Sequence, residues 1–300
     1  MLTGVLAGLA AGALWGLVFV APRMLDMSAG GYSSVDLTAG RFAVYGVVAA
    51  AMLLFFRRHR RRPTVRQAWT VLGLSVLGFS GYYLLLVLAI RDAGTEVPTL
   101  VIGTIPVWIM LWGKPQHLRW AALAPGLLLT VAGLLLMVGA TRTSLPDAGI
   151  HLWRGLALVT ASLVCWTAFA ILNSAWLKRH PEVQATDWAN WLGIATGGGA
   201  ALLWLVAGSP AQTLAAQPDR ASFALLCIVT GFGSAWLATI LWNIASRRLS
   251  ASLCGQLIVS ETLFALVYSF AWDGHWPSSS QFAACVLFTL GIFASIKAHR

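Results

Sequence analysis

Long apolar stretches separated by short polar gaps recur along the whole chain. Each is close to the roughly 20 residues that a helix rising about 1.5 Å per residue needs to cross a hydrocarbon core of about 30 Å. Barrel strands are ~10 residues long and alternate with period two, which these runs do not. We therefore predict an all-α polytopic membrane protein. Its ten transmembrane helices are expected at about residues 2–22, 37–56, 68–90, 96–113, 119–140, 153–177, 188–207, 221–246, 251–272 and 279–297.

The composition strengthens this prediction. The chain is 58% hydrophobic and 10% charged, whereas soluble domains are about 25% charged. Too few polar side chains remain to cover a surface that faces water. The first apolar run has no basic region before it and continues to Phe19, so we expect a first transmembrane helix there rather than a cleaved signal.

Six arginines lie within the ten residues from Arg57 to Arg66 of a chain whose net charge is +10. Such a run can indicate a nucleic-acid patch, a targeting signal or a segment held at a membrane surface. A DNA-binding domain spreads its cations over one face of a fold, whereas these occupy a gap between two apolar stretches. We interpret the run as a marker of the cytoplasmic side, with some attraction to anionic lipid headgroups.

The distribution of charge predicts the orientation. If the N-terminus is cytoplasmic, fourteen of the twenty Lys and Arg residues fall on the inner side, and most acids fall on the outer side. The positive-inside rule therefore predicts a multi-pass protein of the cell inner membrane with both termini in the cytoplasm. Arg41 lies near the outer end of its helix, where it is expected to snorkel towards the headgroups.

Residues typical of catalysis and metal binding do not form recognisable sets. The cysteines Cys165, Cys227, Cys254 and Cys285 all fall in predicted helices without CxxC spacing, and the six histidines show no HExxH motif. The sequence also contains no GxxxxGK[ST] motif and no nucleophile placed near a base. We expect no enzyme activity, no cofactor or metal, and no nucleic-acid partner.

Weak similarities between the two halves suggest an internal repeat. At an offset of 151 residues Gly4 aligns with Gly155 and Trp15 with Trp166, and at an offset of 156 four further identities occur. Five helices in each half place the halves in opposite orientations. We therefore expect two halves, residues 1–145 and 146–300, related as an inverted repeat around a central cavity, which is typical of secondary transporters.

Several segments in this order resemble one transporter family. These are Arg41-Phe42 opening the second helix, TIPVWIMLWG in the fourth, SETLFALVYSFAWDG in the ninth, and LLLTVAGLLLMVG and VLFTLGIF in the fifth and tenth. Together they resemble the EamA-type, ten-helix branch of the drug/metabolite transporter superfamily. The third-helix GFSGYYLLLVLAIRDAG and the aromatic content are most similar to the YddG-type aromatic amino acid exporters. The resemblance implies a secondary exporter without a cofactor.

A site for a neutral zwitterion with an aromatic side chain needs aromatic and aliphatic walls and a few hydrogen-bonding groups. Aromatic and hydroxyl side chains at depth supply this inventory, although ordinary helix packing is the alternative for each of them. Pro98 and Pro106 remove backbone donors, so freed carbonyls near Thr99 could bind an ammonium group, or the prolines could simply curve the helix. The candidate substrate-binding residues are Trp15, Phe79, Tyr82, Tyr83, Thr99, Trp166, Trp236 and Thr239.

Three polar residues at depth are candidates for coupling or for lining the path: Glu261, Asn243 and Gln256. A carboxylate within a membrane span is costly and is a functional hypothesis by default, so Glu261 could carry a proton or bind an ammonium group. It could equally pair with a polar neighbour. Asn243 and Gln256 could instead hydrogen-bond between helices.

We expect export of neutral, mainly aromatic amino acids or similar metabolites by alternating access. The expected partners are this small-molecule substrate and membrane lipid, and we expect the protein to be a monomer. Export of lipophilic drugs or cations is the alternative. Acids at membrane depth in addition to Glu261 would favour it, and the sequence shows none. A transporter of phosphorylated metabolites should place Lys or Arg at depth, where the sequence shows none.

Overall fold

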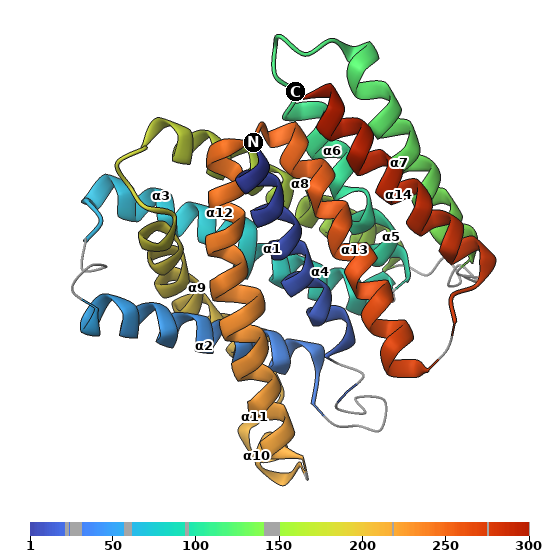
Figure 1. Ribbon diagram of the computed structural model, residues 1–300. Helices are drawn as coiled ribbons and strands as arrows, with labels where there is room; N and C mark the ends of the chain where they lie inside the picture. The colour runs from blue at the N-terminus through green and yellow to red at the C-terminus, as the bar shows by residue number, and fades with distance from the viewer. Residues whose placement is uncertain are drawn as a thin grey trace.

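The computed structural model describes residues 1–21, 24, 32–56, 62–93, 96–140, 151–217, 219–274 and 276–299, and within these ranges the regular structure is entirely helical. Figure 1 shows the helices packed as one bundle, with both chain ends on the same side. The elements are α1 (Leu2–Val20), α2 (Ser34–Phe55), α3 (Val65–Ser75), η4 (Val76–Ser80), α4 (Gly81–Ala93), α5 (Glu96–Gly103), α6 (Ile105–Trp112), α7 (Trp120–Ala140), α8 (Leu152–Arg179), α9 (Ala185–Ala207), α10 (Ala211–Ala216), α11 (Arg220–Val229), η5 (Thr230–Leu237), α12 (Ala238–Arg248), α13 (Ala251–Asp273) and α14 (Ser279–Ala298).

Eight continuous helical segments in the described part of the chain are long and apolar enough to cross a membrane. Two shorter apolar segments, Leu2–Val18 and Val101–Trp112, accompany them, and the second includes the end of α5 and the whole of α6. This is the architecture of a polytopic membrane protein. The spans Val65–Ala93 and Arg220–Arg248 are each 29 residues long, and each contains a π-helical segment, η4 or η5, near its middle.

The fourth predicted helix is interrupted, which corrects the expectation of one continuous, kinked helix. A turn at Thr104 separates α5 from α6, and Pro106 follows at the start of α6. Proline cannot donate a backbone hydrogen bond and fits the first turn of a helix, so it favours a new start here. The Thr104 hydroxyl donates to the Val101 carbonyl at 2.6 Å and accepts from the Trp108 indole at 3.1 Å.

Glycines allow α1 to pack closely against α12 and α13. Gly4, Gly8, Gly12 and Gly16 recur every four residues, so they form one stripe along α1. A methyl group added at Gly16 would lie 2.9 Å from the backbone nitrogen of Ala265, and one at Gly8 would lie 2.7 Å from Leu257. Small residues at membrane helix interfaces permit this approach of backbones.

Asp36 fixes the start of α2 and joins it to the end of α9. Its carboxylate accepts from the Ser33 backbone and hydroxyl at 2.9 and 2.7 Å, which completes a capping box. It also accepts from the Ser209 backbone and hydroxyl at 2.8 and 2.7 Å. Four hydrogen bonds satisfy a carboxylate that is only 2% exposed. Further along the same pair of helices, Gly46 and Gly197 are in backbone contact.

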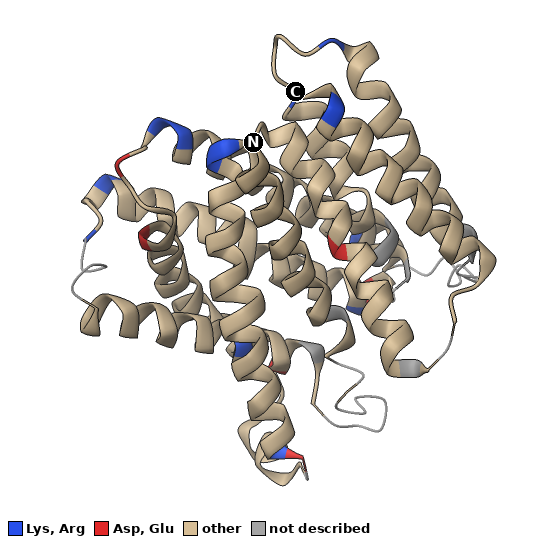
Figure 2. Cartoon of the chain, in the orientation of Figure 1, with Lys and Arg blue, Asp and Glu red and all other residues tan. Residues whose placement is uncertain are grey.

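The described cations gather on the side of the bundle that carries both chain ends, as Figure 2 shows. Arg57 to Arg61, the greater part of the basic run, lie outside the described residues. Arg154, in the first turn of α8, pairs with Asp92, with a distance of 2.7 Å between Nη2 and Oδ1. The described Lys and Arg residues of the loops and helix ends predicted to be cytoplasmic are Arg62, Arg66, Lys114, Arg119, Lys178, Arg179, Arg247, Arg248 and Lys297.

Candidate functional site

Three tryptophans from three helices meet inside the bundle. Trp15 on α1 lies 6.2 Å from Trp166 on α8 between ring centroids, in an edge-to-face arrangement. Trp242 on α12 lies 5.3 Å from Trp15 and 6.4 Å from Trp166. Trp15 and Trp166 are half-buried, whereas Trp242 is buried. We call these three residues the tryptophan cluster.

A row of aromatic rings continues from the tryptophan cluster across the bundle. Ring centroids lie 6.1 Å apart between Trp166 and Phe169, and 5.5 Å apart between Phe169 and Phe79. Phe79 belongs to η4, where the wider π turn changes the direction of the following side chains relative to an α-helix. Such segments often occur at functional sites. The row continues through Phe42 to Tyr83 and ends at Tyr82.

Arg41 stands at the far end of this row and points inwards. Its Nη2 donates to the Tyr83 hydroxyl at 2.7 Å, and its guanidinium carbon lies 4.9 Å from the centroid of Phe42 and 5.0 Å from that of Tyr83. Arg41 is 7% exposed, so the expectation that it snorkels outwards is wrong. The hydrogen bond and the two aromatic faces stabilise the cation within the bundle.

Glu261 on α13 lies partly buried within electrostatic range of Arg41 and Tyr82. Among the described residues its side chain has no hydrogen bond and no close ion pair. A carboxylate with only a distant cation is free to exchange a proton or to bind a cationic group. The geometry therefore leaves both roles open to this residue.

The other candidate residues lie in helix interfaces. Trp236 donates from Nε1 to Asn190 Oδ1 at 2.8 Å, and Thr239 lies beside the Tyr45 hydroxyl. Asn243 accepts from Asn173 at 3.1 Å, which ties α12 to α8. The side chain of Thr99 lies outside the described part of the structure.

Gln256 lies in a different interface from the tryptophan cluster. Its Nε2 donates to Thr130 at 2.9 Å on α7, and its Oε1 accepts from Ser295 at 3.0 Å on α14. These bonds satisfy a side chain that is fully buried. Gln256 thus joins α13 to α7 and α14 by hydrogen bonds. This is the interhelical role that the sequence left open as the alternative to lining the transport path.

Sequence reasoning missed Trp242, although it completes the tryptophan cluster. The offset of 156 residues that aligned the third and eighth helices pairs Trp242 with Leu86, so the repeat gave no signal there. Its indole Nε1 is buried and has no partner among the described residues, as is also true of the hydroxyl of Thr167. Buried polar atoms normally have partners, so each of these two atoms is a candidate for contact with a ligand or water.

The described residues contain no group of His, Cys, Asp and Glu that could hold a metal ion. The four cysteines are free thiols, two of them buried. The groups that the site offers are aromatic faces, hydrogen-bond donors and one carboxylate.

Comparisons with known proteins agree with this architecture. The sequence profile of the EamA-like transporter family matches residues 2–141. The chain is 30% identical over 313 residues to the inner membrane protein YtfF of Escherichia coli, covering 99% of this chain and 96% of that protein. It is 29% identical over 165 residues to the uncharacterized transporter YdeK of Bacillus subtilis, covering 53% of each.

A solved crystal structure superposes on the fold with a TM-score of 0.77 at 23% identity, covering 99% of this chain and 98% of the other. That likeness shows the fold alone. The full-length similarity to YtfF, the family profile and the helical architecture together identify the chain as a membrane transporter: it belongs to the EamA-like transporter family of the drug/metabolite transporter superfamily.

Proposed function

We propose that the protein is a secondary transporter that exports neutral, mainly aromatic amino acids or similar metabolites by alternating access. The observation that carries this proposal is the tryptophan cluster. Three indoles from α1, α8 and α12 present apolar faces and at least one unpartnered N–H donor inside the bundle. Aromatic groups favour offset or edge-to-face contacts with other aromatic groups, which contribute about 0.5–1.5 kcal/mol beyond burial.

The proposed architecture is ten transmembrane helices arranged as an inverted repeat of residues 1–145 and 146–300. The two shorter apolar segments, added to the eight long spans, give the ten. The third and eighth spans, counterparts in the two halves, each contain a π-helical segment about ten residues from their start. Contact between Trp15 and Trp166, aligned positions of the two halves, further supports the repeat.

The proposed orientation places both termini in the cytoplasm of a bacterial cell, with the chain in the inner membrane. Cations gather on the side of the chain ends, as the positive-inside rule requires of the cytoplasmic face. The relative YtfF is named an inner membrane protein. We propose a monomer as the functional unit.

Export of lipophilic cations is the second candidate, and Glu261 is the observation that favours it. An acid inside the bundle without a close partner could bind a cationic drug. Arg41 opposes this role, because its cation lies within electrostatic range of the same carboxylate. A zwitterion, which carries both charges, matches Glu261 and Arg41 together better than a cation does.

Counterflow in proteoliposomes tests the proposal. Vesicles loaded with unlabelled phenylalanine should accumulate labelled phenylalanine and tryptophan faster than labelled threonine, aspartate or a lipophilic cation such as tetraphenylphosphonium. Accumulation of the cation without any amino acid would favour the second candidate and contradict the first.

A further inference from the structure

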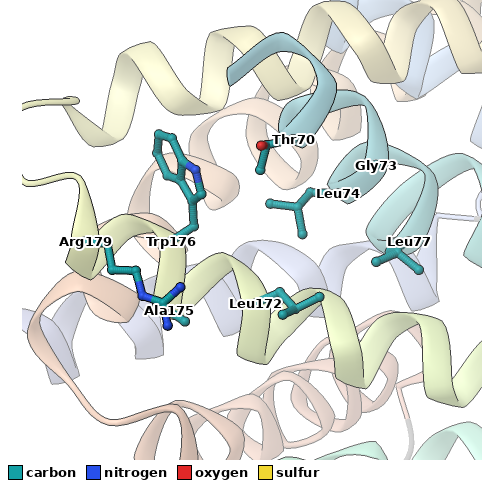
Figure 3. Close-up of a pocket in the computed structure, with 8 residues that line it drawn as sticks. All are labelled: Thr70, Gly73, Leu74, Leu77, Leu172, Ala175, Trp176 and Arg179. Carbon is teal, nitrogen blue, oxygen red and sulfur yellow. The ribbon is translucent and has the colours of Figure 1, made fainter. Parts of the chain in front are cut away.

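We propose that the groove between α3 and α8 binds one anionic phospholipid, with an acyl chain among its apolar side chains and the phosphate at Arg179. Figure 3 shows the groove, with Trp176 and Arg179 at one end and Leu77 and Leu172 at the other. Its volume is about 330 Å³. The lining residues are Thr70, Gly73, Leu74, Leu77, Leu172, Ala175, Trp176 and Arg179.

The groove opens sideways, towards lipid. Both walls belong to candidate membrane spans, Val65–Ala93 and Leu152–Arg179. Leu172 is 51% exposed, and a methyl group added at Gly73 would meet no atom within 4 Å. Because hydrocarbon surrounds these helices, the occupant with direct access to the groove is an acyl chain.

Two arginines at the end of the groove lack anionic partners. Arg179 lies in the last turn of α8, and Arg66 lies one turn before Thr70 on the same face of α3. Among the described residues neither guanidinium makes a hydrogen bond or an ion pair. Arg247, on the same side of the bundle, instead donates to the carbonyls of Val183 and Pro181 at 2.7 Å each.

A phosphodiester supplies what this end of the groove lacks. Guanidinium binds phosphate through paired hydrogen bonds, and it does so best where water is scarce. Trp176 lies one turn before the end of α8, at the depth where tryptophans anchor helices to the headgroup region. No described carboxylate lines the groove, so the ammonium of a zwitterionic headgroup has no partner there. These features favour an anionic lipid.

Native mass spectrometry of the full chain, with equal amounts of phosphatidylglycerol and phosphatidylcholine of the same acyl composition, tests the proposal. The wild-type protein should retain phosphatidylglycerol in preference to phosphatidylcholine. Replacing both arginines (Arg66→Gln with Arg179→Gln) should lower this preference by about fivefold for each arginine. Gly73→Leu, at a glycine where an added methyl group would meet no atom within 4 Å, should occupy part of the groove and reduce the retention of both lipids.

Two matched variants serve as controls. Arg119→Gln removes a cation from the same side of the bundle but away from the groove. Gly198→Leu changes another exposed glycine, where an added methyl group would meet no atom within 4 Å. Both should retain lipid as the wild type does. Equal retention of the two lipids by the wild type, or losses in the controls as large as in the groove variants, would overturn the proposal.

Discussion

At the scale of single residues, the unpartnered indole of Trp242 is the feature that most directly suggests contact with a substrate. A buried N–H without a partner costs about 1–3 kcal/mol, and that cost is removed when a ligand accepts the bond. The indole lies against Trp15, so one bound molecule could contact both rings.

Trp242→Phe keeps an aromatic ring and removes the donor. We expect counterflow of phenylalanine to fall about tenfold, because a hydrogen bond to a charged group contributes roughly 1.5–3 kcal/mol. The control is Trp153→Phe, at a side chain that is 75% exposed. If Trp242→Phe raises the thermal stability above that of the wild type and leaves transport unchanged, the indole N–H does not bind the substrate.

Glu261 gives the second prediction at this scale. If its carboxylate carries the coupling proton, Glu261→Gln should abolish the dependence of transport on a pH gradient and leave substrate exchange measurable. Glu182→Gln, in the loop after α8, is the control. A well-folded Glu261→Gln protein with unchanged gradient dependence would remove this residue from the coupling mechanism.

At the scale of elements, glycine contacts determine how closely α1 approaches α13. The methyl group that Gly16 lacks would meet backbone rather than a flexible side chain, so the helices would have to separate. Gly16→Val should lower stability by about 1–3 kcal/mol, the usual cost of overpacking, and lower the thermal transition of the detergent-solubilised protein. Gly198→Val, at a glycine where an added methyl group would meet no atom within 4 Å, should change the thermal transition little. Equal transitions for the two variants would contradict the close packing of α1 on α13.

The helices were predictable from the sequence because apolar runs of membrane-spanning length have few alternatives. The pairing of Trp15 with Trp166 was also accessible, since aligned halves place both residues in the first helix of each half. The break at Thr104 was not predictable, because the run stays apolar on both sides of it. The inward direction of Arg41 was not predictable either, because it depends on Tyr83, 42 residues further along the chain.

At the scale of the whole molecule, the bias of charge predicts the orientation in the membrane. In a variant without the four cysteines, a single cysteine placed within residues 57–66 should be protected from an impermeant thiol reagent in intact cells. A cysteine placed within residues 273–276 should react. Labelling of the arginine-rich segment from outside would contradict the proposed orientation.

The central claim is that both halves of the molecule contribute to one aromatic binding site. It is tested most directly by the ratio of phenylalanine to threonine counterflow in the Trp166→Ala and Trp15→Ala variants. Loss of aromatic contacts of about 0.5–1.5 kcal/mol should lower that ratio by roughly two- to tenfold, more for Trp166→Ala than for Trp15→Ala, with protein levels preserved. Trp69→Ala, at an exposed helix end, should leave the ratio unchanged. Equal losses for both substrates, or no loss, would contradict the claim and make the tryptophan cluster a matter of helix packing.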